Sequence, residues 1–231
     1  MGDIQLWHVS LDRPPEEAER LAAVLAPDER SRANRFRDAA LGRRFVVGRA
    51  TLRQLLGRQL SRDPKEIGFT YGAAGKPELI DLSSHGLHFN LTHSQGVAII
   101  AVSPGRPIGV DVERIRPDFA GEEIAARFFS PREQAMLSAL PADQRIESFF
   151  RCWTRKEAFI KLLGAGLSFP LDKFDVSLAP GAPAELLALR GESGAKTRWS
   201  LREIDAPPEH VAAVAVEGTL NQIISGERTD P

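Results

Sequence analysis

The chain of 231 residues contains one cysteine, Cys152, which excludes an intramolecular disulfide and any zinc site built from several cysteines. The bulky apolar neighbours of Cys152 predict a buried structural thiol rather than a nucleophile. Histidines occur only at positions 8, 85, 88, 93 and 210, too dispersed for zinc-ligand spacing. The sequence also lacks a glycine-rich P-loop and a dinucleotide-binding fingerprint.

Long hydrophobic runs are missing as well. The longest, GVAIIAV at 96–102, is far too short to cross a bilayer. The first residues, MGDIQLWHVSLDRPPEE, lack the basic region and apolar core of a secretory signal. Because the apolar and charged fractions, 42% and 26%, are those of ordinary globular proteins, we expect a soluble, cytoplasmic protein with no membrane partner.

Charge is nearly balanced overall but unevenly distributed. The formal net charge of −1 gives no indication of a bulk polyanion-binding role, yet residues 30–62 contain ten arginines and one acid, Asp38. Such a segment favours a phosphorylated or acidic partner, or equally a solvated helix face. Nucleic acid is a poor candidate partner, because the chain as a whole is not basic.

Hydrophobic periodicity predicts two long helices. Apolar residues at helical spacing indicate one helix over 40–60, and a second is expected over 143–163, ended by Gly164 and Gly166. Helical sequence also follows the prolines at 14–15, with Asp28 as a possible cap for a second short helix, and Ser130 begins a capping box. Strands are expected at 4–11, 87–103 (bent at HSQG), 108–114, 173–178, 197–204 and 210–218.

The order of these elements repeats once along the chain. A connector, SPGRP at 103–107, separates the two series, so we place a boundary between residues 1–104 and 105–231. Each half contains a long helix followed by strands that end in GVAIIAVS or VAAVAVEG. Because residue identity between the halves is slight, the pattern indicates at most a degenerate internal duplication.

The stretch IGVDVER at 108–114 places two acids in an apolar, β-branched run. Residues two apart on a strand share a face, so Asp111 and Glu113 project side by side while Val110 and Val112 face the other way. Adjacent carboxylates repel each other unless a cation or a proton lies between them. The alternative is an exposed strand edge that carries charges.

The second long helix contains WTRKEAFIKLLGAGL at 153–167. Trp153, Glu157 and Lys161 are spaced four apart, which places them on one stripe, and Lys156 lies beside it. Glu157 and Lys161 alone could form a plain surface ion pair. If Glu157 joins the two strand acids, three carboxylates without histidine or cysteine make a hard-oxygen site that suits Mg²⁺ best.

Five motifs together resemble a known family. GKPEL, FNLTHS, GVDVER, FFS and WTRKEAFIKLLGAGL, spanning roughly residues 75–170, are similar to the 4′-phosphopantetheinyl transferases of the surfactin-synthetase-activating type. The resemblance implies a pseudo-dimer of two similar α+β halves in one chain, with the active site at their interface. It also implies a monomer, since the shorter holo-acyl-carrier-protein synthases of about half this length assemble as trimers.

The resemblance implies a reaction as well. A serine of an apo acyl or peptidyl carrier protein attacks the β-phosphorus of coenzyme A, takes the phosphopantetheine arm and releases 3′,5′-ADP. Asp111, Glu113 and Glu157 would bind Mg²⁺ on the pyrophosphate, and Glu157 is also the implied general base. Lys161 would neutralise charge on the transferred phosphate.

Contacts to coenzyme A are implied on the same basis. Arg44 matches the arginine on the 3′-phosphate side, with Arg32 and Arg37 as helpers. Thr92 stands where serine is common in the family, which preserves the hydroxyl. The residues implied to contact coenzyme A are Arg44, Gly75, Lys76, Pro77, Thr92, His93, Lys156 and Lys161.

Two other functions are compatible with the residues alone. One is a different Mg²⁺-dependent enzyme acting on a nucleotide pyrophosphate. The other is a non-catalytic module that binds coenzyme A or a carrier protein with the same fold. Stabilisation by coenzyme A together with Mg²⁺ would separate the transferase from a nucleic-acid binder.

Overall fold

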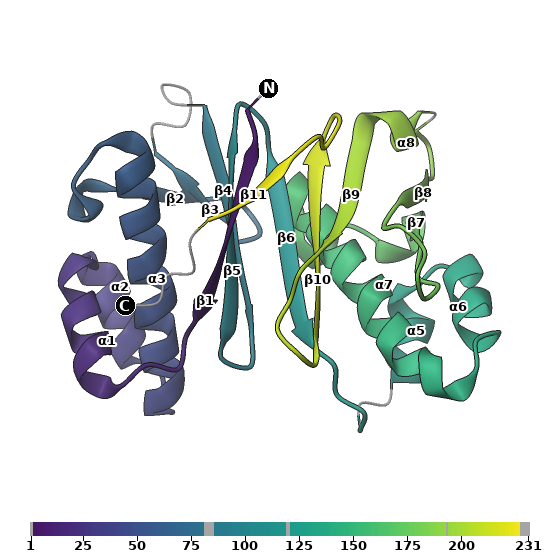
Figure 1. Ribbon diagram of the computed structural model, residues 1–231, viewed down its shortest axis with the longest axis horizontal. Helices are drawn as coiled ribbons and strands as arrows, with labels where there is room; N and C mark the ends of the chain where they lie inside the picture. The colour runs from purple at the N-terminus through teal and green to yellow at the C-terminus, as the bar shows by residue number, and fades with distance from the viewer. Residues whose placement is uncertain (1, 81–85, 119–120, 193, 227–231) are drawn as a thin grey trace.

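The computed structural model describes residues 2–80, 86–118, 121–192 and 194–226, and its elements fall into two series of the same order (Figure 1). His85 lies outside the described residues. The first series comprises β1 (Ile4–Ser10), α1 (Pro15–Leu21), η1 (Ala22–Val24), α2 (Pro27–Asn34), α3 (Ala39–Leu60), η2 (Pro64–Glu66), β2 (Phe69–Tyr71), β3 (Pro77–Leu79), β4 (Leu87–Ser94) and β5 (Val97–Pro104).

The second series follows directly and closes with one additional strand. It comprises β6 (Ile108–Arg114), α5 (Gly121–Phe128), α6 (Pro131–Ser138), α7 (Ala142–Leu163), η3 (Gly166–Ser168), η4 (Leu171–Lys173), β7 (Phe174–Val176), β8 (Leu186–Leu189), α8 (Ala195–Arg198), β9 (Trp199–Ile204), β10 (His210–Glu217) and β11 (Ile223–Ser225). In both series a strand leads through helices, the last of 22 residues, to a two-stranded hairpin and then to two more strands.

The sheets repeat the same topology. One sheet has the order β11-β1-β5-β4 and the other the order β6-β10-β9, so in each the first strand of its series pairs antiparallel with the last strand of the repeat. The pseudo-dimer that the resemblance implied is therefore confirmed as two similar α+β halves. β11 has no counterpart in this repeat and extends the first sheet by pairing parallel with β1.

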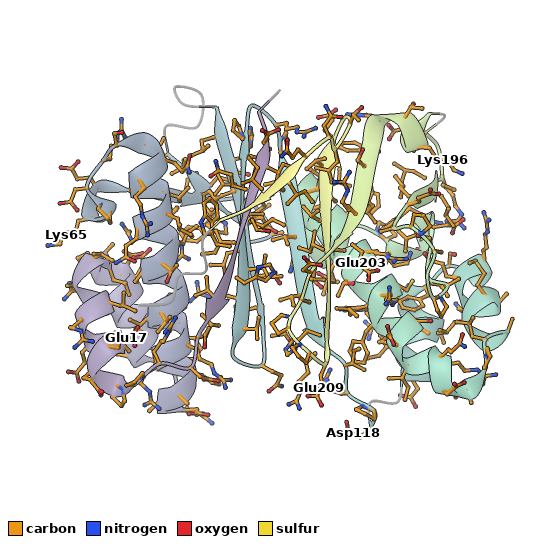
Figure 2. All side chains as sticks on the ribbon, viewed as in Figure 1. Glu17, Lys65, Asp118, Lys196, Glu203 and Glu209 are labelled. Carbon is orange, nitrogen blue, oxygen red and sulfur yellow. The ribbon has the colours of Figure 1, made fainter. Side chains whose placement is uncertain are left out.

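The halves pack as four layers, with helices outside and the two sheets between them (Figure 1). Ile4 and Leu6 of β1 meet Val110 and Val112 of β6 in a buried cluster between the sheets. The α3 helix covers the outer face of the first sheet and α7 that of the second. Figure 2 shows charged side chains such as Lys65, Lys196 and Glu209 at the periphery. No helix in the described part of the chain is long and apolar enough to span a membrane.

Capping residues define the ends of the helices. The Asp38 side chain accepts a hydrogen bond from the amide of Ala40 at the start of α3, and Gly164 ends α7 in the left-handed region at φ 67°. The predicted capping box is confirmed, since Ser130 and Glu133 exchange hydrogen bonds at the start of α6. The predicted role of Asp28 is wrong, because Ala26 occupies the cap position of α2 and Glu29 accepts its amide hydrogen bond.

Candidate active site

Asp111 and Glu113 project from β6 toward α7, on the face opposite Val110 and Val112, as the strand period predicted. Gly109, on the same face, allows the close packing. A Cβ at this position would lie 2.0 Å from the Ala158 carbonyl oxygen, so only glycine lets the strand and the helix approach this closely. The two acids are thereby held against the surface of α7.

The predicted stripe of α7 faces these acids. Trp153, Glu157 and Lys161 line a cavity of about 320 Å³ together with Asp111 and Glu113. The Lys161 Nζ lies 2.5 Å from Asp111 Oδ1 in an ion pair. The structure therefore brings the five polar and aromatic side chains of the hypothesis into one place.

The N-terminal half supplies the opposite wall through β4. Thr92 Oγ1 donates a hydrogen bond to Asp111 Oδ1 at 3.0 Å and accepts one from Lys161 at 3.2 Å. Two residues along the strand, Ser94 Oγ donates to Glu113 Oε2 at 2.9 Å. Asn90, on the same face of β4, accepts a hydrogen bond from the backbone of β6. Sequence reasoning missed Ser94 and Asn90, although their spacing of two from Thr92 was a usable signal.

Burial raises the pKa values of all three carboxyl groups, and repulsion by neighbouring carboxylates adds to this for Glu113 and Glu157. For Asp111 the cause is burial, opposed by Lys161, and for Glu113 it is burial followed by the charge of Asp111. Burial and then Asp111 raise the pKa of Glu157 to about 7, again against the effect of Lys161. At neutral pH, Glu157 is therefore poised to accept a proton.

The donor set fits a hard divalent cation. Asp111 Oδ2 is buried without a hydrogen-bond partner, and the charge of Asp111 raises the pKa values of Glu113 and Glu157, a repulsion that a cation would relieve. Within residues 2–80, 86–118, 121–192 and 194–226, however, no three His, Cys, Asp or Glu side chains are grouped so that they could hold a metal ion. The Mg²⁺ site thus stays a prediction, and Lys161 would have to share Asp111 with the ion.

A second cavity, of about 640 Å³, continues from the first into the N-terminal half. Leu91 and His93 line both cavities. Four of the residues implied to contact coenzyme A line this nucleotide-side cavity, namely Arg44, Gly75, Pro77 and His93. Burial, with Lys161, lowers the pKa of His93, which favours a neutral imidazole that can donate a hydrogen bond.

The basic residues near this cavity are not equivalent. Arg44 donates two hydrogen bonds to Asp12, at 2.6 and 3.0 Å, and this partner raises its pKa. Arg32 lines the cavity and lies over the Phe45 ring at 5.1 Å. Arg37 is exposed and is not among the residues that line it.

Lys76 connects the two halves instead of lining the cavity. Its Nζ donates hydrogen bonds to the carbonyl oxygens of Ile108, at 2.9 Å, and Lys161, at 2.7 Å. These carbonyls belong to the start of β6 and the end of α7. Burial, and then the charge of Lys161, lower the pKa of Lys76 to about 8. The Lys76 ammonium thus links the N-terminal half to β6 and α7, the two elements that carry the acids.

The predicted contact of Lys156 with coenzyme A is wrong. Lys156 is fully buried in the C-terminal core, where it pairs with Glu133 at 2.7 Å. It also donates to the carbonyl oxygens of Leu171 and Phe174, at 2.6 and 2.7 Å. Lys156 precedes Glu157 by one position on α7. Its side chain therefore points away from the stripe and toward α6 and β7. Its charge balances the capping-box glutamate in the interior.

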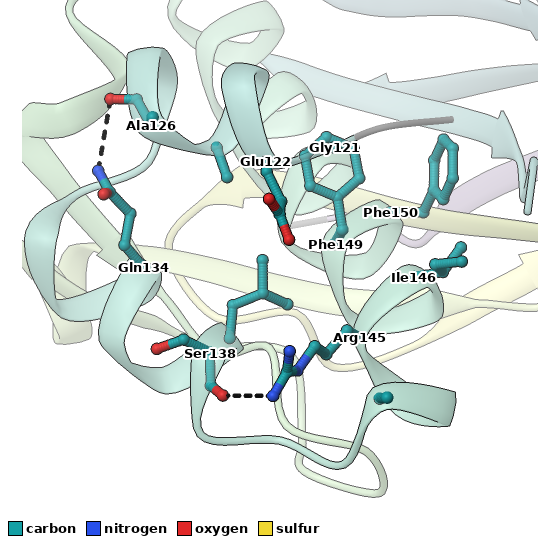
Figure 3. Close-up of a pocket in the computed structure, with 12 residues that line it drawn as sticks. Gly121, Glu122, Ala126, Gln134, Ser138, Arg145, Ile146, Phe149 and Phe150 are labelled. Atoms are coloured by element: carbon teal, nitrogen blue, oxygen red, sulfur yellow. Dashed lines mark hydrogen bonds between the residues drawn. The ribbon is translucent and has the colours of Figure 1, made fainter. Parts of the chain in front are cut away.

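A third cavity, of about 510 Å³, lies between α5, α6 and α7 (Figure 3). Its wall is mainly apolar, with Ile146, Phe149 and Phe150 from α7. The Phe149 ring stacks on Trp153 at 6.3 Å between centroids, and Trp153 lines the carboxylate cavity. No sequence pattern predicts this groove, because it forms only where three helices converge.

Within residues 2–80 and 86–104, the N-terminal half has no acidic counterpart of the carboxylate cavity. The side chains that β1 turns toward its long helix include Trp7 and Val9, which are buried in the core under α3. The corresponding face of β6 carries Asp111 and Glu113. The two halves therefore have similar folds. Among the described residues, only the C-terminal half carries carboxylates at this place.

Comparison with known proteins identifies the family. A model described as the 4′-phosphopantetheinyl transferase superfamily matches residues 107–215, and a model described as 4′-phosphopantetheinyl transferase, N-terminal, matches residues 12–105. The chain is 42% identical to the 4′-phosphopantetheinyl transferase HetI of Nostoc sp., over 94% of this chain and 88% of that one. It is 37% identical to the 4′-phosphopantetheinyl transferase Sfp of Bacillus subtilis, over 76% and 77% of the two chains.

A solved structure is more distantly similar. The holo-[acyl-carrier-protein] synthase of Thermotoga maritima is 21% identical over 48% of this chain and 62% of that one, with a TM-score of 0.38. The sequence matches, which cover most of the chain, confirm the expected enzyme class, a transferase that moves 4′-phosphopantetheine from coenzyme A. The chain belongs to the 4′-phosphopantetheinyl transferase superfamily.

Proposed function

We propose that this transferase, which moves the 4′-phosphopantetheine arm of coenzyme A to a carrier protein, binds the pyrophosphate where its two cavities meet. The observation that carries the proposal is the shared wall of Leu91 and His93 between the carboxylate cavity and the nucleotide-side cavity. A nucleotide bound against Arg44 would extend past His93 toward Asp111 and Glu157. Lys161 would meet the phosphate that is transferred.

Glu157 is proposed as the general base. The serine Oγ of the carrier attacks the β-phosphorus, its proton passes to Glu157, and the bond from that phosphorus to the bridging oxygen breaks, which releases 3′,5′-ADP. A pKa of about 7 gives Glu157 the proton affinity this step requires near neutral pH. Asp111 and Glu113 take no part in the proton transfer. Asp111 Oδ1 orients Lys161 and Thr92, and Glu113 accepts a hydrogen bond from Ser94.

Asp111, Glu113 and Glu157 would hold Mg²⁺ in this proposal. The ion would supply charge neutralisation on the pyrophosphate. Residues 1–104 would provide the nucleotide contacts, and residues 105–231 the metal ligands and the general base. One chain supplies both walls of the cavity, which supports a monomer as the active form, and a cytoplasmic location remains a prediction.

The test is intact-protein mass spectrometry of apo acyl and apo peptidyl carrier proteins incubated with the enzyme, coenzyme A and Mg²⁺. We expect a mass gain of one phosphopantetheine that EDTA abolishes. Asp111→Asn and Glu157→Gln should each abolish the gain, while Asp118→Asn, at an exposed position outside the cavities, should not. Near-normal transfer by Glu157→Gln would exclude its role as the base. Coenzyme A binding without any transfer would indicate a binding module.

A further inference from the structure

β4 and β6 are edge strands that lie side by side at the boundary between the two halves. β4 ends the sheet β11-β1-β5-β4 and β6 begins the sheet β6-β10-β9, so no backbone ladder of the described residues joins them. Side chains of β4 make the connection instead. Asn90 accepts a hydrogen bond from the Val110 amide at 2.8 Å, and two residues further Thr92 donates to Asp111. The first strand thus contacts the second through side chains at a period of two.

Two hydroxyl groups of β4 meet the two acids of β6 one to one. Thr92 Oγ1 donates to Asp111 Oδ1 at 3.0 Å, and Ser94 Oγ donates to Glu113 Oε2 at 2.9 Å. Asp111 has a second partner in Lys161. In the described part of the chain, Ser94 is the only hydrogen-bond partner of the Glu113 side chain. The orientation of Glu113 therefore depends on one hydroxyl group that belongs to the other half of the protein.

The hydroxyl hydrogen of Ser94 is directed at Glu113. The backbone amide of Arg114 donates to Ser94 Oγ at 3.2 Å, so Ser94 is the acceptor in that contact. A serine hydroxyl has a single hydrogen of its own, and Glu113 Oε2 is the acceptor within its reach. One oxygen of the carboxylate is thereby bound, and the other is left for a ligand in the cavity that Glu113 lines.

A glutamate in this position benefits from such a restraint. Glu113 is half-buried at the wall of an open cavity and has a long, unbranched side chain. Fixing a side chain of this kind costs conformational entropy, which an unrestrained glutamate would lose at the moment it binds a ligand. The shorter Asp111, with 3% exposure, has less of this freedom. Removing a hydrogen-bond partner of a metal-binding carboxylate typically lowers metal affinity by roughly ten- to a hundredfold.

We propose that Ser94 is a positioning residue that fixes the Glu113 carboxylate for cation binding from across the boundary between the halves. The inference rests on the proposed function only in assigning Glu113 to the Mg²⁺ site. Ser94 acts through Glu113 and takes no part in the chemical step. The N-terminal half thus contributes to the acidic site as well as to the nucleotide contacts, and the geometry of the acids depends on the docking of the two halves.

Crystal structures of the wild type and Ser94→Ala test the orientation directly. In the wild type Glu113 should keep one orientation into the cavity. In Ser94→Ala its carboxylate should turn toward solvent or occupy several orientations. Ser94→Thr retains the hydroxyl group and should retain the wild-type orientation, because Thr92 already donates to an acid from the same face of β4.

Calorimetry measures the consequence for the cation. Mg²⁺ is titrated into the complex of enzyme and coenzyme A without carrier protein, against a blank of coenzyme A alone. Binding to Ser94→Ala should be weaker by roughly ten- to a hundredfold, and Ser94→Thr should restore most of the affinity. The Mg²⁺ concentration that gives half-maximal transfer to a carrier protein should rise by the same factor, and excess Mg²⁺ should restore the rate.

His8→Ala is the matched control. The Nε2 atom of His8 on β1 donates to the backbone carbonyl oxygen of Asp205 at 2.8 Å, a contact that also joins the halves but involves no carboxylate group. Each of Ser94→Ala and His8→Ala removes a side-chain contact between the halves, so each should lower the melting temperature of the protein in EDTA. Only Ser94→Ala should weaken the binding of Mg²⁺.

An unchanged orientation of Glu113 in Ser94→Ala would overturn the inference, as would the absence of Mg²⁺ binding in the wild type. Wild-type Mg²⁺ affinity in Ser94→Ala, or an equal loss of affinity in His8→Ala, would also overturn it and leave a purely structural contact. Failure of the wild type to modify any carrier protein, with the Mg²⁺ affinity still dependent on Ser94, would instead count against the proposed function alone.

Discussion

Glu157 should make the stability of the ligand-free protein fall as the pH rises. Burial and the neighbouring Asp111 raise its pKa from the ordinary 4.5 to about 7. A raised pKa in the folded state means that the folded protein binds this proton more tightly than the unfolded chain. The resulting stabilisation is complete below about pH 4.5 and is lost as the pH rises through 7.

The size of the effect follows from the same values. Each pKa unit corresponds to about 1.4 kcal/mol, so complete enclosure would give about 3 kcal/mol. Glu157 lines an open cavity and is partly exposed to water, and screening reduces this to about 1–2 kcal/mol. For a chain of this length, that corresponds to a change in melting temperature of about 3–6 °C.

Thermal melts of wild type and Glu157→Gln between pH 5 and 8, with EDTA present, measure this directly. The melting temperatures of the two proteins should differ least at pH 5, and the variant should melt higher by about that amount at pH 8. Glu19→Gln, on an exposed part of α1, controls for the loss of one charge. Added Mg²⁺ should raise the wild-type melting temperature more at pH 8 than at pH 6. A difference between wild type and Glu157→Gln that does not change with pH would refute the reasoning.

Three further predictions concern the frame of the site. Lys156→Met leaves Glu133 buried without its partner and should lower the free energy of unfolding by about 3–5 kcal/mol in urea melts, while the affinity for 3′,5′-ADP is retained in calorimetry. Gly109→Ala should force β6 and α7 apart, with a loss of about 3 kcal/mol by the same melts and loss of carrier modification by mass spectrometry. Lys76→Met should reduce kcat more than it changes KM for coenzyme A, with partial rescue by Lys76→Arg, since Lys76 holds the end of α7 that carries Lys161. Unchanged melts for the first two, or an effect on KM alone for the third, would contradict these roles.

Much of the fold could be predicted because its signals are local. The helical period identified α3 and α7 to within one residue of their bounds, and the capping box located the start of α6. Short elements were missed, among them α5, β8 and β11, because a few residues carry too little periodic signal. The second short helix expected near Asp28 is present as α2, and the 3₁₀ turn η1 with the extended Leu25 and Ala26 ahead of Pro27 separates it from α1.

The sequence by itself determined which faces of β6 and α7 carry the polar groups. The period of two aligned Asp111 with Glu113, and the period of 3.6 aligned Glu157 with Lys161, whatever lies opposite. Only the tertiary structure decided the partners of these groups. Lys156 and Lys161 are equally polar on the same helix, yet α6 and β7 bury the first beside Glu133 while β4 and β6 leave the second at a cavity. The contacts of Lys76 are of the same kind, because its partners at Ile108 and Lys161 lie on elements distant in the chain.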